Sequence, residues 1–210
     1  MHYPENVARL DVFDKAEQRR LKRVAVVRVA AIAFNRRGFV NTSLDEVATA
    51  LGISKPALYQ YFKNKQDILY ECHLVAIVHG EAGVALARQH DGDGLEKLFV
   101  YLRRYMRGFF DDLGSCAVLL DVSSLADIHR GEVLNRRAAV TAGVEALVAG
   151  GVVDGSIVSC DPKLGALFAF GVVNWMSVWY RADGPKTPEQ IIDAFSQFFR
   201  KGFAASGPTV

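Results

Sequence analysis

Residues 42–65, which read TSLDEVATALGISKPALYQYFKNK, constrain the fold more than any other part of the sequence. Ser43 followed three positions later by Glu46 is the capping-box pattern of a helix start, and apolar residues then recur at helical spacing. Gly52 suits the left-handed conformation that often ends a helix. Ser54 is then placed to cap the start of a second helix. The segment is therefore predicted to form two short helices joined by a tight turn.

Two helices joined in this way form a helix-turn-helix. In that motif the second helix enters the DNA major groove, and its first residues reach the base edges. Lys55 can donate to guanine or phosphate, and Gln60 can read a base, while the tyrosine hydroxyls can reach phosphate oxygens. The residues predicted to contact DNA are Thr42, Ser54, Lys55, Pro56, Ala57, Tyr59, Gln60, Tyr61 and Lys65.

The longer run from Lys22 to Leu69 resembles the DNA-binding domain of the TetR family of transcriptional regulators. The resemblance is carried by LGISKPALYQYFKNK, with its Leu-Tyr-x-x-Phe-x-x-Lys spacing. It implies an all-α protein with a three-helix head in residues 1–66 and a larger helical domain for ligand binding and dimerisation in residues 67–210. It also implies a homodimer that binds palindromic double-stranded DNA and represses transcription until a ligand releases it. The alternative is a helical hairpin without a DNA role.

The distribution of charge supports two domains. The net charge is only +2, but residues 1–66 carry 12 Lys/Arg and 6 Asp/Glu, whereas residues 67–210 carry 13 and 17. A basic N-terminal third on a mildly acidic body is typical of a DNA-binding head on a regulatory domain.

The remaining chain is predicted to be a series of helices. Residues 1–15 are expected to form a mobile arm or a loose extra turn. The helix at 162–180 is almost wholly apolar, which indicates burial against a partner subunit as well as its own core, and we expect dimerisation through it and the last helix. The expected helices cover residues 16–37, 65–89, 95–112, 115–128, 132–149, 162–180 and 188–203.

Residues 174–203 are similar to the C-terminal ends of TetR-family regulators of fatty-acid and steroid breakdown, some of which respond to acyl-CoA thioesters. The similarity is carried by Asn174-Trp175, Trp179-Tyr180 and Asp183-Gly184-Pro185. It implies a small lipophilic effector such as an acyl-CoA, and the alternative is a sensor of drugs or small aromatic ligands. The candidate ligand-binding residues are Arg103, Arg104, Arg107, Phe109, Phe110, Phe168 and Trp175.

Each of these candidates has a second interpretation. The arginines could bind the phosphates of a CoA group in a bidentate way, or form a solvated face. The phenylalanines, with Phe170, could line a pocket or form ordinary core. Trp175 and Trp179 share a helix face and could stack on a ligand or fill the dimer core.

Other functions find no support in the sequence. It contains no GxSxG turn and no phosphate-binding glycine loop, and its five histidines are scattered, so we expect no enzyme, no metal site and no cofactor. Three distant cysteines without a CxxC indicate a reducing, cytoplasmic setting. The N-terminus lacks the apolar stretch of a signal peptide. The sequence also contains no uncharged apolar run of about 18 residues, so we expect no membrane-spanning helix.

Overall fold

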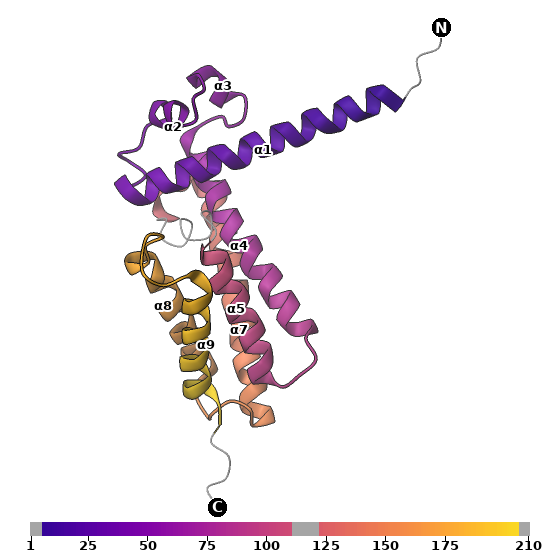
Figure 1. The fold of residues 1–210 in the computed structure, drawn as a ribbon, viewed down its shortest axis with the longest axis vertical. Helices are drawn as coiled ribbons and strands as arrows, with labels where there is room; N and C mark the ends of the chain where they lie inside the picture. Colours follow the sequence, from indigo (N-terminus) through magenta and orange to yellow (C-terminus); the bar gives the residue numbers. More distant parts are fainter. Residues whose placement is uncertain (1–5, 111–121, 206–210) are drawn as a thin grey trace, which may run out of the picture.

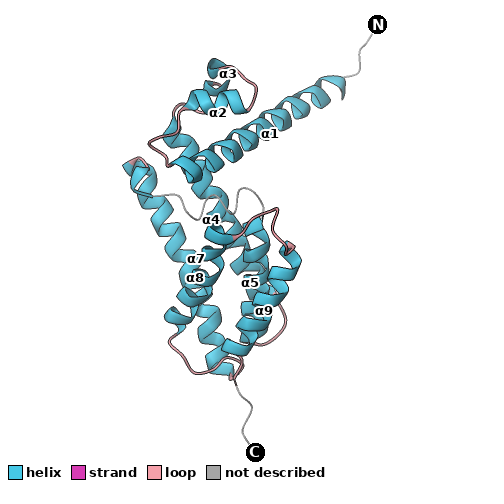
Figure 2. Cartoon of the chain, turned by 60° about the vertical axis from the view of Figure 1, so that its left-hand side comes forward, coloured by secondary structure: helices cyan, strands magenta, loops and turns pink. Residues whose placement is uncertain are grey.

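The computed structural model describes residues 6–110 and 122–205, with side chains from residue 15 onward. Within these residues the chain is helical (Figure 2), and the one strand-like contact is an isolated bridge between Ile157 and Ala204. The all-α prediction is confirmed. The helices are α1 (Asn6–Arg37), α2 (Leu44–Ala50), α3 (Lys55–Tyr59), α4 (Lys65–Gln89), α5 (Gly94–Phe110), α7 (Asp127–Asp154), α8 (Pro162–Trp179) and α9 (Pro188–Phe203), with a 3₁₀ turn η1 (Val122–Ser124).

The head of the molecule is formed by α1, α2, α3 and the start of α4 (Figure 1). The predicted capping box is present, because the Ser43 side chain accepts from the Glu46 backbone N–H and the Glu46 carboxylate accepts from the Ser43 N–H. Gly52 has a φ of +65°, as expected for the turn between the two short helices. Ser54 caps α3. Local sequence therefore specifies this motif as predicted.

Helix α1 is longer than the sequence analysis predicted. It begins at Asn6, ten residues before the expected start, and its N-terminal half extends away from the head (Figure 1). At 1.5 Å per residue, its 32 residues span about 48 Å. No proline or glycine interrupts the chain between Asn6 and Arg37, so nothing stops the helix from propagating toward the N-terminus. The expected arm is thus helical from Asn6, and its first five residues lie outside the described part.

The body of the molecule is a bundle of α4, α5, α7, α8 and α9 around one apolar core (Figure 1). Helix α4 belongs to both parts, since Ile68 and Leu69 lie in the head core while Val84 and Ala87 lie in the body core. Leu125 and Val133, from the body side of the chain, also enter the head core. The head is therefore packed onto the body as well as tethered to it.

Helix α7 differs from its predicted bounds of 132–149. It begins at Asp127 and continues to Asp154, where Gly155 ends it in the left-handed conformation, at φ +79°. The Gly-Gly pair inside it does not break it. The backbone of α5 comes close to α7 at this place, because Gly94 has no side chain: a Cβ on Gly94 would clash with the Gly151 backbone. Of the expected helix at 115–128, residues 115–121 are outside the described part, and the remainder forms η1 and the start of α7.

Helix α4 has the length and composition of a membrane-crossing helix, and it is the one such helix among the described residues. In this structure it packs against α1, α5 and α7. The core helix of a bundle meets the same criteria, so the composition of α4 is explained by its packing.

Candidate nucleic-acid interface and ligand cavity

The second short helix of the head, α3, is anchored by one residue and otherwise faces outward. Leu58 is completely buried, while Lys55, Pro56 and Tyr59 are exposed. The Lys55 ammonium lies 2.7 Å from an Asp45 carboxylate oxygen, and this hydrogen bond raises the pKa of Lys55. An exposed pair of this kind is weak, so a phosphate or a base can replace the carboxylate. The outward surface of α3 is thus free to enter a DNA groove.

Two other predicted DNA contacts have internal roles in this structure. Thr42 is buried, and its hydroxyl lies within hydrogen-bond distance of the Ala33 and Gly38 carbonyls, at 3.2 and 3.0 Å. The Ser54 hydroxyl accepts from the Ala57 N–H. Both residues therefore shape the motif, and their contact with DNA stays a prediction.

Lys65 is engaged by the backbone of the loop before α2. Its ammonium donates to the carbonyls of Phe39, Val40 and Thr42 at 2.6, 3.3 and 2.9 Å. It also lies 4.3 Å from the centre of the Phe39 ring, a cation–π distance. These contacts favour a structural role for Lys65 over the predicted phosphate contact.

The basic middle part of α1 lies against the end of α3. Arg19 donates to the Gln60 carbonyl at 3.2 Å, and Arg23 donates to the Tyr61 carbonyl at 2.6 Å. These bonds satisfy carbonyls that the short helix leaves open at its C-terminus. Beside them is a hollow of about 180 Å³, whose lining residues are Lys15, Gln18, Arg19, Lys22, Gln60 and Tyr61. Its charge is positive, as a DNA phosphate requires.

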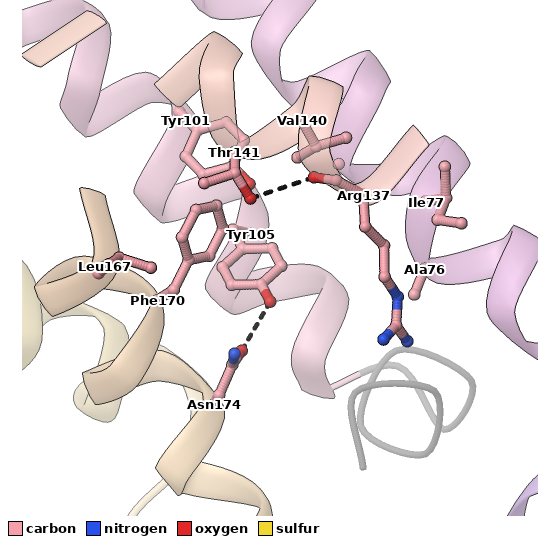
Figure 3. A pocket seen from close by; sticks show the side chains of 11 residues that line it. Ala76, Ile77, Tyr101, Tyr105, Arg137, Val140, Thr141, Leu167, Phe170 and Asn174 are labelled. Carbon is pink, nitrogen blue, oxygen red and sulfur yellow. Dashed lines mark hydrogen bonds between the residues drawn. The ribbon is translucent and has the colours of Figure 1, made fainter. Parts of the chain in front are cut away.

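The body contains a cavity of about 280 Å³ between α4, α5, α7 and α8 (Figure 3). Its wall is mostly apolar. The described lining residues are Ala76, Ile77, Gly80, Tyr101, Tyr105, Arg137, Val140, Thr141, Leu167, Phe170 and Asn174. Aromatic rings form one side of the cavity, because Tyr101 and Tyr105 stack with centres 5.7 Å apart and Phe170 meets both edge-on.

Five polar side chains interrupt this apolar wall, those of Tyr101, Tyr105, Arg137, Thr141 and Asn174. The Tyr105 hydroxyl donates to the Asn174 side-chain oxygen at 2.7 Å, and burial raises the pKa of Tyr105 to about 12 (Figure 3). The Arg137 guanidinium donates to His73 Nδ1 on α4 at 2.8 Å, and burial lowers the pKa of Arg137. The Tyr101 hydroxyl is buried and has no hydrogen-bond partner among the described residues.

Comparison with protein families explains why the two sites occur together. Residues 26–72 match the model of bacterial regulatory proteins of the tetR family, and residues 91–203 match the tetracyclin repressor-like C-terminal domain. The second match alone covers more than half of the chain. The chain belongs to the TetR family. It is thus a DNA-binding transcriptional regulator, as members of this family are.

Solved structures agree with this assignment. The TetR-family regulator PfmR from Thermus thermophilus is 29% identical, with 84% of this chain and 97% of PfmR covered and a TM-score of 0.74. KstR2 of Mycobacterium tuberculosis, a ketosteroid regulator, is similar in fold, with 19% identity, coverage of 88% and 96%, and a TM-score of 0.79. AibR, solved in complex with isovaleryl coenzyme A and operator DNA, shares 24% identity, with coverage of 86% and 99% and a TM-score of 0.73.

None of the seven ligand-binding candidates from the sequence lines the described cavity of this TetR-family chain. Arg103 pairs with Asp193 of α9 at 3.1 Å, and Arg107 is exposed. Arg104 packs its stem near Gly83 of α4.

The aromatic candidates also lie elsewhere. Phe109 is core, and Phe110 packs against Tyr180. Phe168 and Trp175 are 56% and 63% exposed, on the outer face of α8. The ligand role of all seven therefore stays a prediction, and the cavity supplies a different set of candidates.

An apolar surface along α8 and α9 remains uncovered in the single chain. Its members are exposed in spite of their size, and they recur at helical spacing along α8. They are Leu164, Phe168, Trp175, Val178 and Trp179 of α8 and Phe198 of α9. Dimers are typical of the TetR family, and a surface of this kind is what a partner subunit covers. The prediction that the tryptophans contribute to a dimer core is consistent with this exposure.

Sequence reasoning missed most of the cavity residues. Tyr101, Tyr105 and Arg137 were not among the ligand-binding candidates. Only Phe170, among the lining residues, was considered as a pocket residue. A usable signal existed in α5, where two tyrosines four residues apart place two hydroxyls on an otherwise apolar face.

Proposed function

We propose that this TetR-family protein is a homodimeric repressor that a small lipophilic effector releases from its operator. The observation that carries the proposal is the apolar cavity, because α4 forms part of its wall and also part of the head core. A ligand that moves α4 against α7 changes the position of the head. It can do so only by as much as it binds one arrangement better than the other.

The DNA-binding half of the proposal is supported by the head. Lys55 and Tyr59 of α3, and Gln60 directly after it, are exposed to solvent. The hollow beside α1 adds positive charge. In a dimer, two such helices must meet major grooves about 34–36 Å apart, so the operator is expected to be a rough palindrome.

The effector half is supported by the size and the lining of the cavity. At about 280 Å³ it lies at the lower end of ligand pockets, which are typically about 300–1,000 Å³. This favours the acyl part of a short or branched acyl-CoA over a long fatty chain. The isovaleryl-CoA complex of AibR, a protein of similar fold, supports the same class. The second candidate is a small aromatic ligand, which the rings of Tyr101, Tyr105 and Phe170 favour.

A gel shift tests the proposal. The protein is mixed with DNA from around its own promoter, and short, branched and long acyl-CoA thioesters, the matching free acids and small aromatic compounds are added in turn. We expect a shifted band that a short or branched acyl compound abolishes. If the protein bound neither this DNA nor any DNA recovered by selection from random sequences, the proposal that it is an operator-binding repressor would be refuted.

A matched pair of variants tests the location. Val140 lines the cavity, whereas Ala139 faces solvent on the same helix. Val140→Phe fills the space and should abolish release while DNA binding remains, and Ala139→Phe should behave as wild type. Equal release from both variants would place the effector outside this cavity. Thermal melts of both variants show whether each is folded.

A further inference from the structure

Resting on the proposed effector cavity, we infer that the effector is an acyl compound whose carbonyl or carboxylate oxygen is bound by Arg137 and the Tyr101 hydroxyl. Its hydrocarbon part lies among apolar lining residues such as Ile77, Val140 and Leu167. The class includes carboxylic acids and their thioesters, and excludes amines and purely hydrocarbon ligands.

The first argument is the balance of hydrogen-bonding groups in the cavity. Among its described lining residues none is acidic, and Arg137 carries the one full charge. The Asn174 side-chain oxygen already accepts from Tyr105, which leaves the Asn174 amide nitrogen to donate. The Thr141 hydroxyl donates to the Arg137 carbonyl of its own helix at 3.1 Å (Figure 3). The described polar side chains of the wall thus present mainly donors, which suit an acceptor on the ligand.

The second argument is the Tyr101 hydroxyl. Tyr101 is completely buried in the wall formed by α5, where its ring meets the Phe170 ring edge-on (Figure 3). Its hydroxyl has no hydrogen-bond partner among the described residues. A buried polar group without a partner destabilises a protein, so native structures keep few of them. An oxygen acceptor on a bound ligand would satisfy this hydroxyl.

The third argument is the position of Arg137. Its guanidinium reaches across from α7 to His73 on α4, where the acceptor is a ring nitrogen. An ionised or strongly polar oxygen is a better acceptor for a guanidinium than an imidazole nitrogen, because charge-assisted hydrogen bonds are about twice as strong as neutral ones. An acyl oxygen at this place would compete with the present partners of Arg137, His73 among them. Recognition of the ligand would therefore alter a contact of the helix that enters the head.

Calorimetric titration of the full-length protein without DNA tests the inference. The probes are isovaleryl-CoA, free isovalerate, the S-(3-methylbutyl)-CoA thioether, which lacks only the carbonyl oxygen, and 3-methylbutylamine. Other short acyl groups extend the thioester and acid series. We expect the thioester or the acid to bind, the thioether to bind roughly 10-fold more weakly or not at all, and the amine not to bind. Whichever of the thioester and the acid binds more tightly identifies the source of the acyl group.

Three variants assign the donors. Arg137→Met should weaken binding of the acyl probe by roughly 10- to 100-fold, and Tyr101→Phe by roughly 2- to 10-fold, as expected for a charged and a neutral hydrogen bond. Arg136→Met is the control, because the neighbouring Arg136 pairs with Glu81 outside the cavity. Tyr101→Phe should also raise the melting temperature of the ligand-free protein, since it removes an unsatisfied buried hydroxyl. A hydroxyl with a merely structural role would have the opposite effect.

The inference is overturned if no acyl probe binds, if the thioether or the amine binds as tightly as the thioester, or if Tyr101→Phe and a folded Arg137→Met both bind like wild type. The repressor proposal fails separately, through the gel shift. A protein that binds its operator and is released by a lipophilic amine would remain a repressor and would refute the acyl class.

Discussion

Replacement of Lys65 by methionine separates the two roles that this residue could have. The sequence pattern predicts that Lys65 contacts a DNA phosphate, whereas the structure shows its ammonium bound to three carbonyls of the loop that precedes α2. Methionine keeps an unbranched stem over the Phe39 ring and removes the charge. The variant therefore tests the ammonium alone.

The size of the effect follows from the three contacts. Hydrogen bonds to charged groups contribute about 1.5–3 kcal/mol each, but Lys65 is only half-buried and the Val40 contact is long, at 3.3 Å. We therefore expect a total loss of about 2–3 kcal/mol in the free energy of unfolding. In a chain of this length each kcal/mol lowers Tm by about 2–4 °C, so Tm should fall by roughly 4–12 °C.

The assay combines a thermal melt with a salt titration of operator binding, at a temperature where the variant is folded. Each phosphate contact contributes about 0.9 to the slope of log K against log salt, so loss of one contact per subunit would flatten the slope of a dimer by about 1.8. We expect the slope of Lys65→Met to be unchanged. Lys63→Met is the control: Lys63 is exposed shortly after α3, where a lysine can reach a DNA phosphate, so its loss should flatten the slope without a change in Tm. A flattened slope and an unchanged Tm for Lys65→Met would refute the structural role.

Three further predictions concern other parts of the molecule. Gln60→Ala should change the preference among operator variants in a binding-site selection, because Gln60 is exposed at the end of α3; equal weakening on every variant would show that it reads no base. Trp175→Glu should convert the dimer to monomers in analytical ultracentrifugation, because it places a charge in the exposed apolar surface of α8; a variant that stays dimeric would place the interface elsewhere. Gly94→Ala should destabilise the protein by at least about 1–3 kcal/mol in a denaturant melt, because its Cβ would lie 2.2 Å from the Gly151 backbone; an unchanged midpoint would contradict that close approach.

The head was predictable because its determinants are local. The capping box at Ser43 and Glu46, the turn at Gly52 and the cap at Ser54 each act within a few residues, and all are present. Helix ends with strong local determinants were also found, such as Pro188, where a Thr187 cap precedes the last helix. The N-terminal limit of α1 was missed because no residue there marks one.

The cavity was not predictable because four helices assemble it. Tyr101 in α5 and Phe170 in α8 are far apart in the sequence, yet the centres of their rings lie 6.1 Å apart. The arginines of α5 were chosen for their charge, but Arg103 lies on the side of that helix that faces α9. Side-chain direction depends on how the helices rotate against each other, and residue type alone does not specify that rotation.

The contacts between α4 and α7 suggest how the cavity and the head communicate. Tyr70 donates to Glu132 at 2.7 Å, and Arg136 forms two bonds with Glu81, at 2.9 and 2.8 Å. The Arg137–His73 bond lies between them in the sequence of α4. One residue away, the Cys72 sulfur is 3.7 Å from the Val27 carbonyl of α1. A change at Arg137 is thus adjacent to the interface of α4 with the head.

The energy available at this place is of the right order for a switch. Shifting a regulator from 99:1 to 1:99 between two head arrangements requires about 5.5 kcal/mol of differential binding. A charge-assisted hydrogen bond at one Arg137 supplies about 1.5–3 kcal/mol, which alone is too little. A dimer has two cavities, and the two together supply about 3–6 kcal/mol if both act on the same transition. Full release therefore requires effector in both subunits, and the release curve should be steeper than the binding curve of a single site.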